Sequence, residues 1–122
     1  MYKCKKNTKQ MKVRNKKMKY NIEKINGHEH AQVRVYKYED GTVVLRSYNT
    51  DVCMIDKNGW LYCTGTYSRT TIKHIGWFMR EYGHGFGYYT AKRAYEMGMV
   101  FNLETGECLT YEEYNKIVEK IA

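Results

Sequence analysis

The fold is decided by one stretch of the chain, VCMIDKNGWLYC at residues 52–63. Asn-Gly between two runs of apolar and aromatic residues is among the strongest short-range signals for a β-hairpin. A three-residue turn at this point pairs Asp56 with Trp60. Counting outward from that pair then places Cys53 opposite Cys63. The stretch therefore predicts two antiparallel strands joined by a tight turn.

Further strand signals lie upstream of this hairpin. Residues 32–38 alternate between β-branched and charged side chains, residues 39–41 are a turn signal, and residues 42–48 form a second β-rich run. A weaker strand signal spans residues 20–25. Together these patterns predict about four antiparallel strands in meander order, with one face exposed and one face packed.

The hydrophobic period changes from two to about 3.6 at Ser68, which indicates a helix. Ser68 is a typical N-cap, and Gly83 is well placed to end the helix. The face expected to pack on the sheet carries Ile72, Ile75, Met79 and Tyr82. A helix is therefore predicted to follow the sheet and to cover it.

The last third of the chain predicts two more helices and a hairpin. Thr90 is expected to cap a short helix over residues 91–97, and residues 99–109 contain two β-rich runs about a Thr-Gly turn. Thr110 and Glu113 form a capping box ahead of a final amphipathic helix. The predicted fold class is α+β: a small antiparallel sheet of about four strands with two to three helices packed on one face.

The positive charge of the chain is concentrated at its N-terminus. The 122 residues have a formal net charge of +8, and residues 1–20 hold nine basic side chains and no acidic one. We therefore expect a basic N-terminal arm, residues 1–20, followed by one α+β domain, residues 21–122. The arm is either a solubilising tail or a nucleic-acid-binding arm that contacts phosphates. In the second case the contacts come from Lys5, Lys6, Lys9, Lys12, Arg14, Lys16 and Lys17.

The helix after Ser68 has a basic stripe opposite its apolar face. At about 100° per residue, the stripe consists of Arg69, Lys73, Trp77 and Arg80. An exposed Trp among cations suits phosphate contacts combined with stacking on a base. The alternative is an ordinary solvated helix face, which is common in proteins.

The four cysteines are Cys4, Cys53, Cys63 and Cys108, and none is in a Cys-x-x-Cys spacing. With no secretory signal expected, the thiols should be free and reduced. Cys53 and Cys63 are two candidate zinc ligands, and the further candidates are His28, His30, His74 and Cys108. Nothing in the spacing brings four ligands together, so we expect buried hydrophobic thiols, no metal and no other cofactor.

The sequence contains no recognised catalytic motif. Gly-x-Ser-x-Gly, His-Glu-x-x-His and zinc-deaminase patterns are missing, and a Cys63–His74 pair has no third group to orient it. The glycines at 83, 85 and 87 follow a helix rather than a strand, which favours a tight connector over a phosphate-binding loop. No apolar run reaches the roughly 18 residues of a membrane-spanning helix. We predict a non-enzyme with no membrane partner and no small-molecule substrate.

The central block of the chain resembles a known pattern. It reads SYNT at 47–50, ID at 55–56, G-x-LY at 59–62, YSxTT at 67–71, HI at 74–75, F at 78 and REYG at 80–83. This pattern, within about residues 32–83, resembles short uncharacterised proteins of phages and mobile elements of Gram-positive bacteria. The resemblance implies an accessory protein of a mobile element in the bacterial cytoplasm, and it implies no particular reaction. The basic arm and the residues after Gly87 lie outside the resembling block.

Two functions fit these observations. The first is a small non-enzymatic phage protein that inhibits host defence, like an anti-CRISPR protein, by binding a nuclease–guide complex and blocking nucleic-acid loading. Its support is the setting, the small size and the basic surface. The second is a nucleic-acid-binding regulatory or accessory protein that uses the basic arm and the basic helix face. The expected partner is thus a bacterial defence nucleoprotein or a nucleic acid, in the host cytoplasm.

Overall fold

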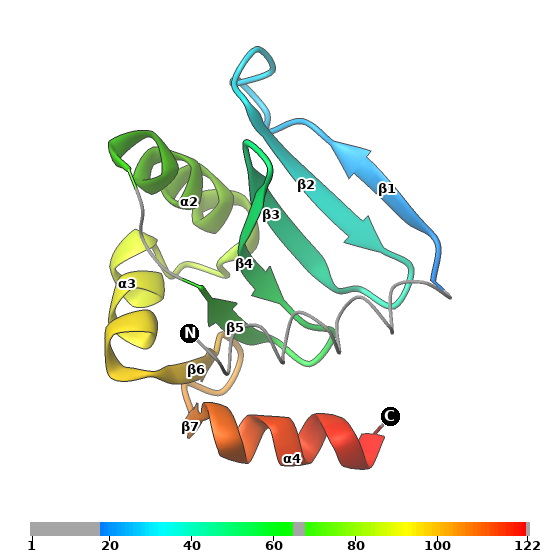
Figure 1. The fold of residues 1–122 in the computed structure, drawn as a ribbon, viewed down its shortest axis with the longest axis vertical. Helices are drawn as coiled ribbons and strands as arrows, with labels where there is room; N and C mark the ends of the chain where they lie inside the picture. The colour runs from blue at the N-terminus through cyan, green and yellow to red at the C-terminus, as the bar shows by residue number, and fades with distance from the viewer. Residues whose placement is uncertain (1–17, 65–67, 122) are drawn as a thin grey trace.

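One antiparallel sheet organises the chain (Figure 1). The computed structural model describes residues 18–64 and 68–121. Within these residues the sheet has seven strands in sequence order, each antiparallel to the next. They are β1 (Tyr20–Glu23), β2 (Val33–Tyr38), β3 (Val43–Ser47), β4 (Thr50–Ile55), β5 (Trp60–Cys63), β6 (Met99–Asn102) and β7 (Cys108–Thr110).

The expected sheet of about four strands is wrong, because the described chain forms seven. The weak signal at residues 20–25 is β1, and residues 99–109 supply β6 and β7. These last two strands join the same sheet, since β6 pairs with β5 through Trp60↔Asn102 and Leu61↔Phe101. Two helices separate β5 from β6 along the chain, so no local pattern reveals that the strands are neighbours.

The described helices cover both faces of the sheet, and the expectation that they share one face is also wrong. The helices α2 (Arg69–Tyr82) and α3 (Tyr88–Met97) pack on the first face, whose core includes Leu45, Ile75 and Phe78. The helix α4 (Tyr111–Ile121) packs on the second face through Tyr114, against Val44, Met54, Tyr62 and Val100. The strand β3 explains this arrangement: three consecutive apolar residues, Val43 to Leu45, are buried, so both faces need cover.

The hairpin over residues 52–63 is confirmed. The Asp56 amide donates to the Trp60 carbonyl at 3.0 Å, and Cys53 lies opposite Cys63. The Asp56 carboxylate is buried and accepts from the amides of Asn58 at 2.9 Å and Trp60 at 3.0 Å. Its other oxygen accepts from the Tyr114 hydroxyl at 2.7 Å, which ties α4 to the turn. The turn residues therefore fix both the hairpin and the helix that covers the second face.

Two of the three described helices begin at the predicted N-cap. α2 begins after Ser68, whose hydroxyl accepts from the Thr71 amide at 3.2 Å, and ends at Gly83. The capping box of α4 is confirmed, since the Glu113 amide donates to the Thr110 hydroxyl at 3.1 Å. α3 instead begins at Tyr88 after Gly87, ahead of the expected residue 91. No helix in the described residues combines the length and apolarity needed to cross a membrane.

Two glycines at α2 are expected to respond in opposite ways to alanine. A Cβ at Gly83 would collide with the carbonyl oxygens of Phe86 and Met79, whereas a Cβ at Gly76 meets nothing within 4 Å. Gly83→Ala should therefore lower the free energy of unfolding by about 1–3 kcal/mol, as overpacking does. Gly76→Ala should raise it by about 0.5–1 kcal/mol, because alanine favours a helix interior. Urea denaturation measures both, and a neutral Gly83→Ala would contradict this packing of the α2–α3 connector.

Candidate functional site

The turn between β3 and β4 is locked onto the first turns of α2. The Ser47 Oγ lies 2.7 Å from the His74 Nδ1 and 3.4 Å from the Thr71 Oγ1. Thr71 Oγ1 is in turn 3.2 Å from the hydroxyl of Ser68, the N-cap. Ser47 belongs to the SYNT block and the other three to the YSxTT and HI blocks, so the resembling motifs meet in space. We call this cluster of Ser47, Ser68, Thr71 and His74 the polar corner.

An aromatic stack lies beside the polar corner. The His28 ring stacks on Trp77 with centroids 3.6 Å apart and planes 6° from parallel, and Trp77 lies 5.4 Å from His74. Trp77 also packs against the first-face core, so it is half-buried. The full exposure predicted for Trp77 is thus wrong, because the loop between β1 and β2 delivers His28 onto its outer side. Nothing in the local sequence pairs these two residues.

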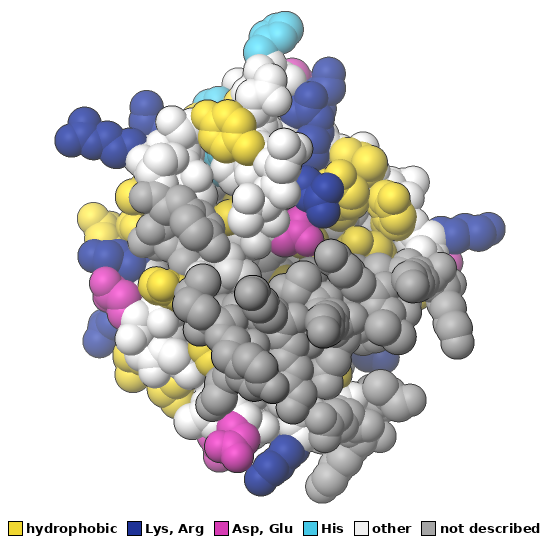
Figure 2. Space-filling view, viewed as in Figure 1, with side chains coloured by type: hydrophobic (Ala, Val, Ile, Leu, Met, Phe, Trp, Pro, Cys, Tyr) yellow, Lys and Arg dark blue, Asp and Glu magenta, His cyan; other side chains and the backbone are white. Residues whose placement is uncertain are grey.

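The cations of the predicted stripe are where the helical period placed them. Arg69, Lys73 and Arg80 are exposed on α2, while Ile75 and Met79 are buried on the sheet. Figure 2 shows dark-blue side chains projecting from the side of the molecule that α2 forms. The other predicted binding residues, from Lys5 to Lys17, lie outside the described residues. Of the four residues of the predicted stripe, three are therefore exposed together. We call Arg69, Lys73 and Arg80 the cationic face.

The surroundings of His74 favour its neutral form. Burial, and then the nearby His28, lowers the pKa of His74 below its ordinary value. Ser47 is 3% exposed and His74 is 1% exposed, so the hydroxyl–imidazole pair is closed off from solvent. The pair positions the turn on the helix, and the expectation of a non-enzyme stays a prediction.

The facing cysteines are core residues. The Cys53 and Cys63 sulfurs are 2.9 Å apart and both side chains are buried in the first-face core. Burial, followed by the hydrogen bond with Cys63, raises the pKa of Cys53 well above its ordinary value, which opposes the thiolate that zinc requires. Cys108 is exposed on β7, and His74 is bonded to Ser47. The described chain contains no group of three or more His, Cys, Asp or Glu side chains placed to hold a metal.

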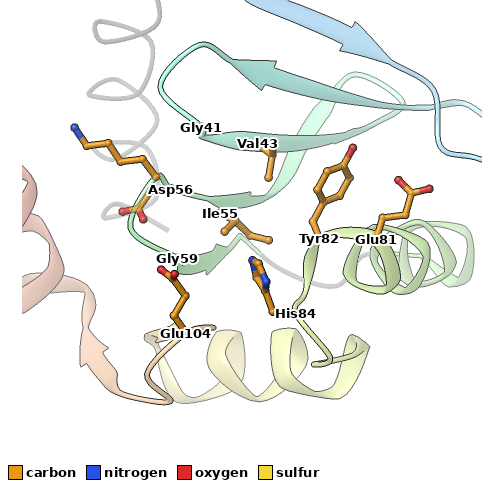
Figure 3. Close-up of a pocket in the computed structure, with 10 residues that line it drawn as sticks. Gly41, Val43, Ile55, Asp56, Gly59, Glu81, Tyr82, His84 and Glu104 are labelled. Atoms are coloured by element: carbon orange, nitrogen blue, oxygen red, sulfur yellow. The ribbon is translucent and has the colours of Figure 1, made fainter.

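A pocket of about 230 Å³ lies between the strand turns and the α2–α3 connector. In Figure 3 the side chains of Tyr82, His84 and Glu104 approach it from different segments. Its lining holds three carboxylates, from Asp56, Glu81 and Glu104, and one cation, Lys57, so negative charge predominates. The connector itself turns tightly, since the Phe86 amide donates to the Gly83 carbonyl at 2.9 Å. The glycines at 83, 85 and 87 therefore lie in a tight connector between two helices, as expected.

A family model, described as a family of unknown function (DUF8033), matches residues 6–95. The chain belongs to this family. The matched region includes β1 to β5, α2 and nearly all of α3, so it contains the whole polar corner and the cationic face. The matched region also starts inside the basic arm, and it extends on both sides beyond residues 32–83, which carry the sequence resemblance. No curated protein and no solved structure matches the chain.

Acidification is expected to weaken the fold through His74. The unfolded chain keeps the ordinary pKa of 6.5 and the folded chain a lower one, so below that pH the unfolded state binds more protons. The free energy of unfolding should be greatest above about pH 6.5 and fall as the pH decreases through the folded value. Urea denaturation at about pH 7.5 and about pH 5.5 should show a smaller decrease for His74→Gln than for wild type. The exposed His30→Gln is the control, and an unchanged decrease in His74→Gln would contradict the assignment.

Proposed function

We propose that this protein is a nucleic-acid-binding accessory protein of a mobile element, acting in the bacterial cytoplasm. The observation that carries the proposal is the exposed cationic face of α2. Arg69, Lys73 and Arg80 project from it, and none forms an ion pair with a described residue. Cations without carboxylate partners remain available for phosphate.

The spacing of the three cations suits a nucleic-acid backbone. With a rise of about 1.5 Å per residue, Arg69 and Lys73 are about 6 Å apart along the helix axis and Arg80 is about 10 Å further. The face thus spreads positive charge over about 16 Å, enough for several successive phosphates. Eight more cations lie in residues 1–17, with no acid among them. Such contacts supply affinity rather than sequence preference.

The anti-defence inhibitor stays a prediction that rests on the setting implied by the resemblance, on the small size of the chain and on its basic surface. An inhibitor that occupies the nucleic-acid channel of a nuclease–guide complex meets a positively charged surface. The cationic face of α2 has the same sign and would be repelled from the empty channel. The charge of the cationic face on α2 therefore favours nucleic acid as the direct partner.

Charge reversal on α2 should weaken nucleic-acid binding. The double variant Arg69→Glu, Lys73→Glu is expected to reduce affinity for a labelled oligonucleotide at least about tenfold, with a smaller dependence on salt. Fluorescence anisotropy at about 50 mM and about 200 mM salt measures both quantities. Thermal unfolding should change little, because both side chains are exposed.

The matched control is Arg93→Glu with Lys116→Glu, which changes the net charge equally at exposed positions of α3 and α4. It should reduce affinity less than about threefold, since distant charges are screened. Equal reductions in the two double variants would show that only net charge matters and that α2 is not the site. If wild type binds neither DNA nor RNA at about 50 mM salt, the proposal is wrong and a protein target replaces it.

Removal of residues 1–17 should lower affinity and leave the body folded. The cut must fall before Lys19, whose carbonyl accepts from the Glu39 amide at 3.0 Å, and before Tyr20, which begins β1. The arm boundary expected at residue 20 therefore lies one residue inside the sheet. On single strands the slope of log affinity against log salt should become shallower by about 0.7 for each phosphate that the arm neutralises in the full chain. A truncated chain that no longer unfolds cooperatively would show instead that residues 1–17 are needed for the fold.

A further inference from the structure

A cluster of tyrosines lies on the second face of the sheet, away from α2. The Tyr20 ring is 5.5 Å from Tyr36 and 5.3 Å from Tyr38, measured between centroids. Tyr20 is 49% exposed and its neighbour on the same face, Ile22, is 53% exposed. Figure 2 shows this hydrophobic patch in yellow over β1 and β2. We call Tyr20, Ile22, Tyr36, Tyr38 and Arg46 the tyrosine face.

Strand register brings these side chains together. Tyr20 pairs with Tyr38 and Ile22 with Tyr36, and the period of two along each strand sends all four to the same side. The helix on this face, α4, packs against β6 and β7 rather than β1 and β2 (Figure 1). The second face of β1 to β3 thus has no helix over it among the described residues.

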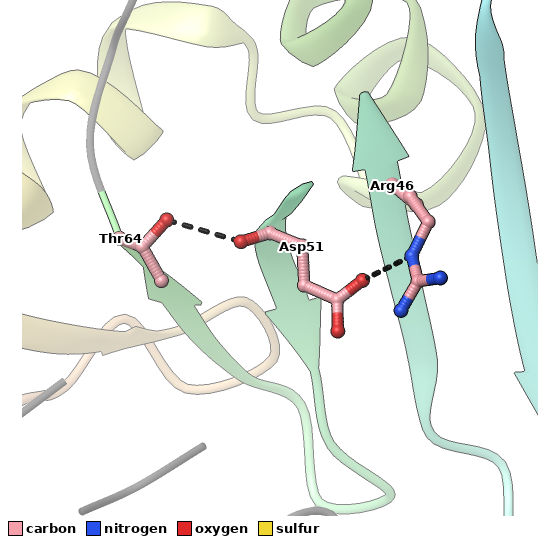
Figure 4. Close-up of polar contacts among 3 residues, drawn as sticks. All are labelled: Arg46, Asp51 and Thr64. Carbon is pink, nitrogen blue, oxygen red and sulfur yellow. Dashed lines mark hydrogen bonds and ion pairs between the residues drawn. The ribbon is translucent and has the colours of Figure 1, made fainter. Parts of the chain in front are cut away.

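Arg46 lies at the edge of the cluster, where an ion pair with Asp51 fixes its position. A bulge shifts the β3–β4 register after Leu45, so that Arg46 pairs with Asp51 instead of Val52. The Asp51 carboxylate accepts from the Arg46 Nε at 2.8 Å, and the Asp51 carbonyl accepts from the Thr64 hydroxyl at 3.2 Å (Figure 4). The guanidinium carbon lies 4.9 Å from the Tyr36 ring centroid.

This geometry orients the guanidinium along the aromatic cluster. The ion pair uses Nε, and no described residue takes up the two terminal amino groups in a hydrogen bond. Arg34, opposite Arg46 in the register, is a second cation on this side of β2. Asp51 partly offsets the charge of Arg46. The tyrosine rings are therefore the main feature of the face, and its positive charge is the lesser one. Planar rings beside an arginine are the elements with which proteins stack unpaired bases.

We propose that the tyrosine face binds single-stranded nucleic acid by stacking bases on Tyr20 and Tyr36, with the terminal amino groups of Arg46 contacting a phosphate. The inference rests on the proposed function and specifies the form of nucleic acid. Tyr20 is the exposed ring of the cluster, and the half-buried Tyr36 lies beside it under the Arg46 guanidinium. A duplex hides its base faces, so only an unpaired strand can stack on these rings. The face offers three rings, one aliphatic side chain, Ile22, and one arginine. Eight cations at residues 1–17 precede Tyr20 in the chain, and this charge favours a nucleic acid over a protein as the ligand.

Stacking is tested with substitutions that remove the ring and keep the apolar bulk. The probes are a fluorescein-labelled oligothymidylate of about 15 nucleotides and a labelled duplex of equal length, read by anisotropy with the full-length protein. Tyr20→Leu and Tyr36→Leu should each weaken single-strand binding roughly tenfold, the reduction expected for one stacked base. Tyr20→Phe should retain wild-type affinity because it keeps the ring. The control is Tyr89→Leu on α3, 74% exposed, which should bind as wild type does.

The salt dependence separates this inference from the proposed function. Leucine removes no charge, so the slope of affinity against salt should be unchanged in Tyr20→Leu, unlike in the α2 charge reversal. If wild type binds the oligonucleotide and both leucine variants bind equally well, the tyrosine face is not a stacking surface, while the proposed function stands. Equal wild-type affinity for duplex and single strand also overturns the inference. Absence of any wild-type binding overturns both. Thermal unfolding of each variant confirms that it is folded.

Discussion

The central strands of this protein are apolar on both faces, and the whole architecture depends on how those faces are covered. Two helices, α2 and α3, cover the first face, where side chains such as Val35 and Leu61 enter one core. Among the described helices only α4 lies on the second face, where it packs along β6 and β7 and its Tyr114 enters the core around Val44 and Met54. The tyrosine face over β1 to β3 is what this unequal cover leaves exposed. Large aromatic surface in water is retained in proteins chiefly where it makes contacts.

The polar corner connects the sheet to the helix that carries the cationic face. Buried polar atoms must find partners, and Ser47 and His74 satisfy one another at 2.7 Å. That hydrogen bond joins the end of β3 to the first turns of α2, the helix from which Arg69 and Lys73 project. The corner thus links the resembling motifs to the cationic face without itself meeting a ligand.

Local patterns account for the parts of the fold that could be predicted from the sequence. The turn at Asp56 to Trp60 and the capping box at Thr110 depend on residues that are neighbours in the chain, and both are confirmed. The exposed cations of α2 likewise follow from the helical period. In each case the information lies within one or two turns of the backbone.

Contacts between distant segments account for what was missed. The pairing of β5 with β6 crosses two helices, and His28 covers Trp77 from another part of the sheet. The bulge that sets Arg46 opposite Asp51 has no local signal, because Val52 fits a regular strand equally well. The tyrosine face was open to prediction, since Tyr36 and Tyr38 alternate within a β-rich run. Their significance depends on pairing with Tyr20, which only the register shows.

The most direct test of the account is an amide chemical-shift titration of the isotope-labelled protein with a single-stranded oligonucleotide. We predict that the largest shifts fall on two sets of residues, the start of α2 around Arg69 and Lys73 and the β1–β2 pair around Tyr20 and Tyr36. The amides of α4 should be nearly unchanged, because that helix covers the other end of the second face. Shifts confined to α3 and α4, or none at saturating oligonucleotide, would contradict the claim that the cationic face of α2 and the tyrosine face bind nucleic acid.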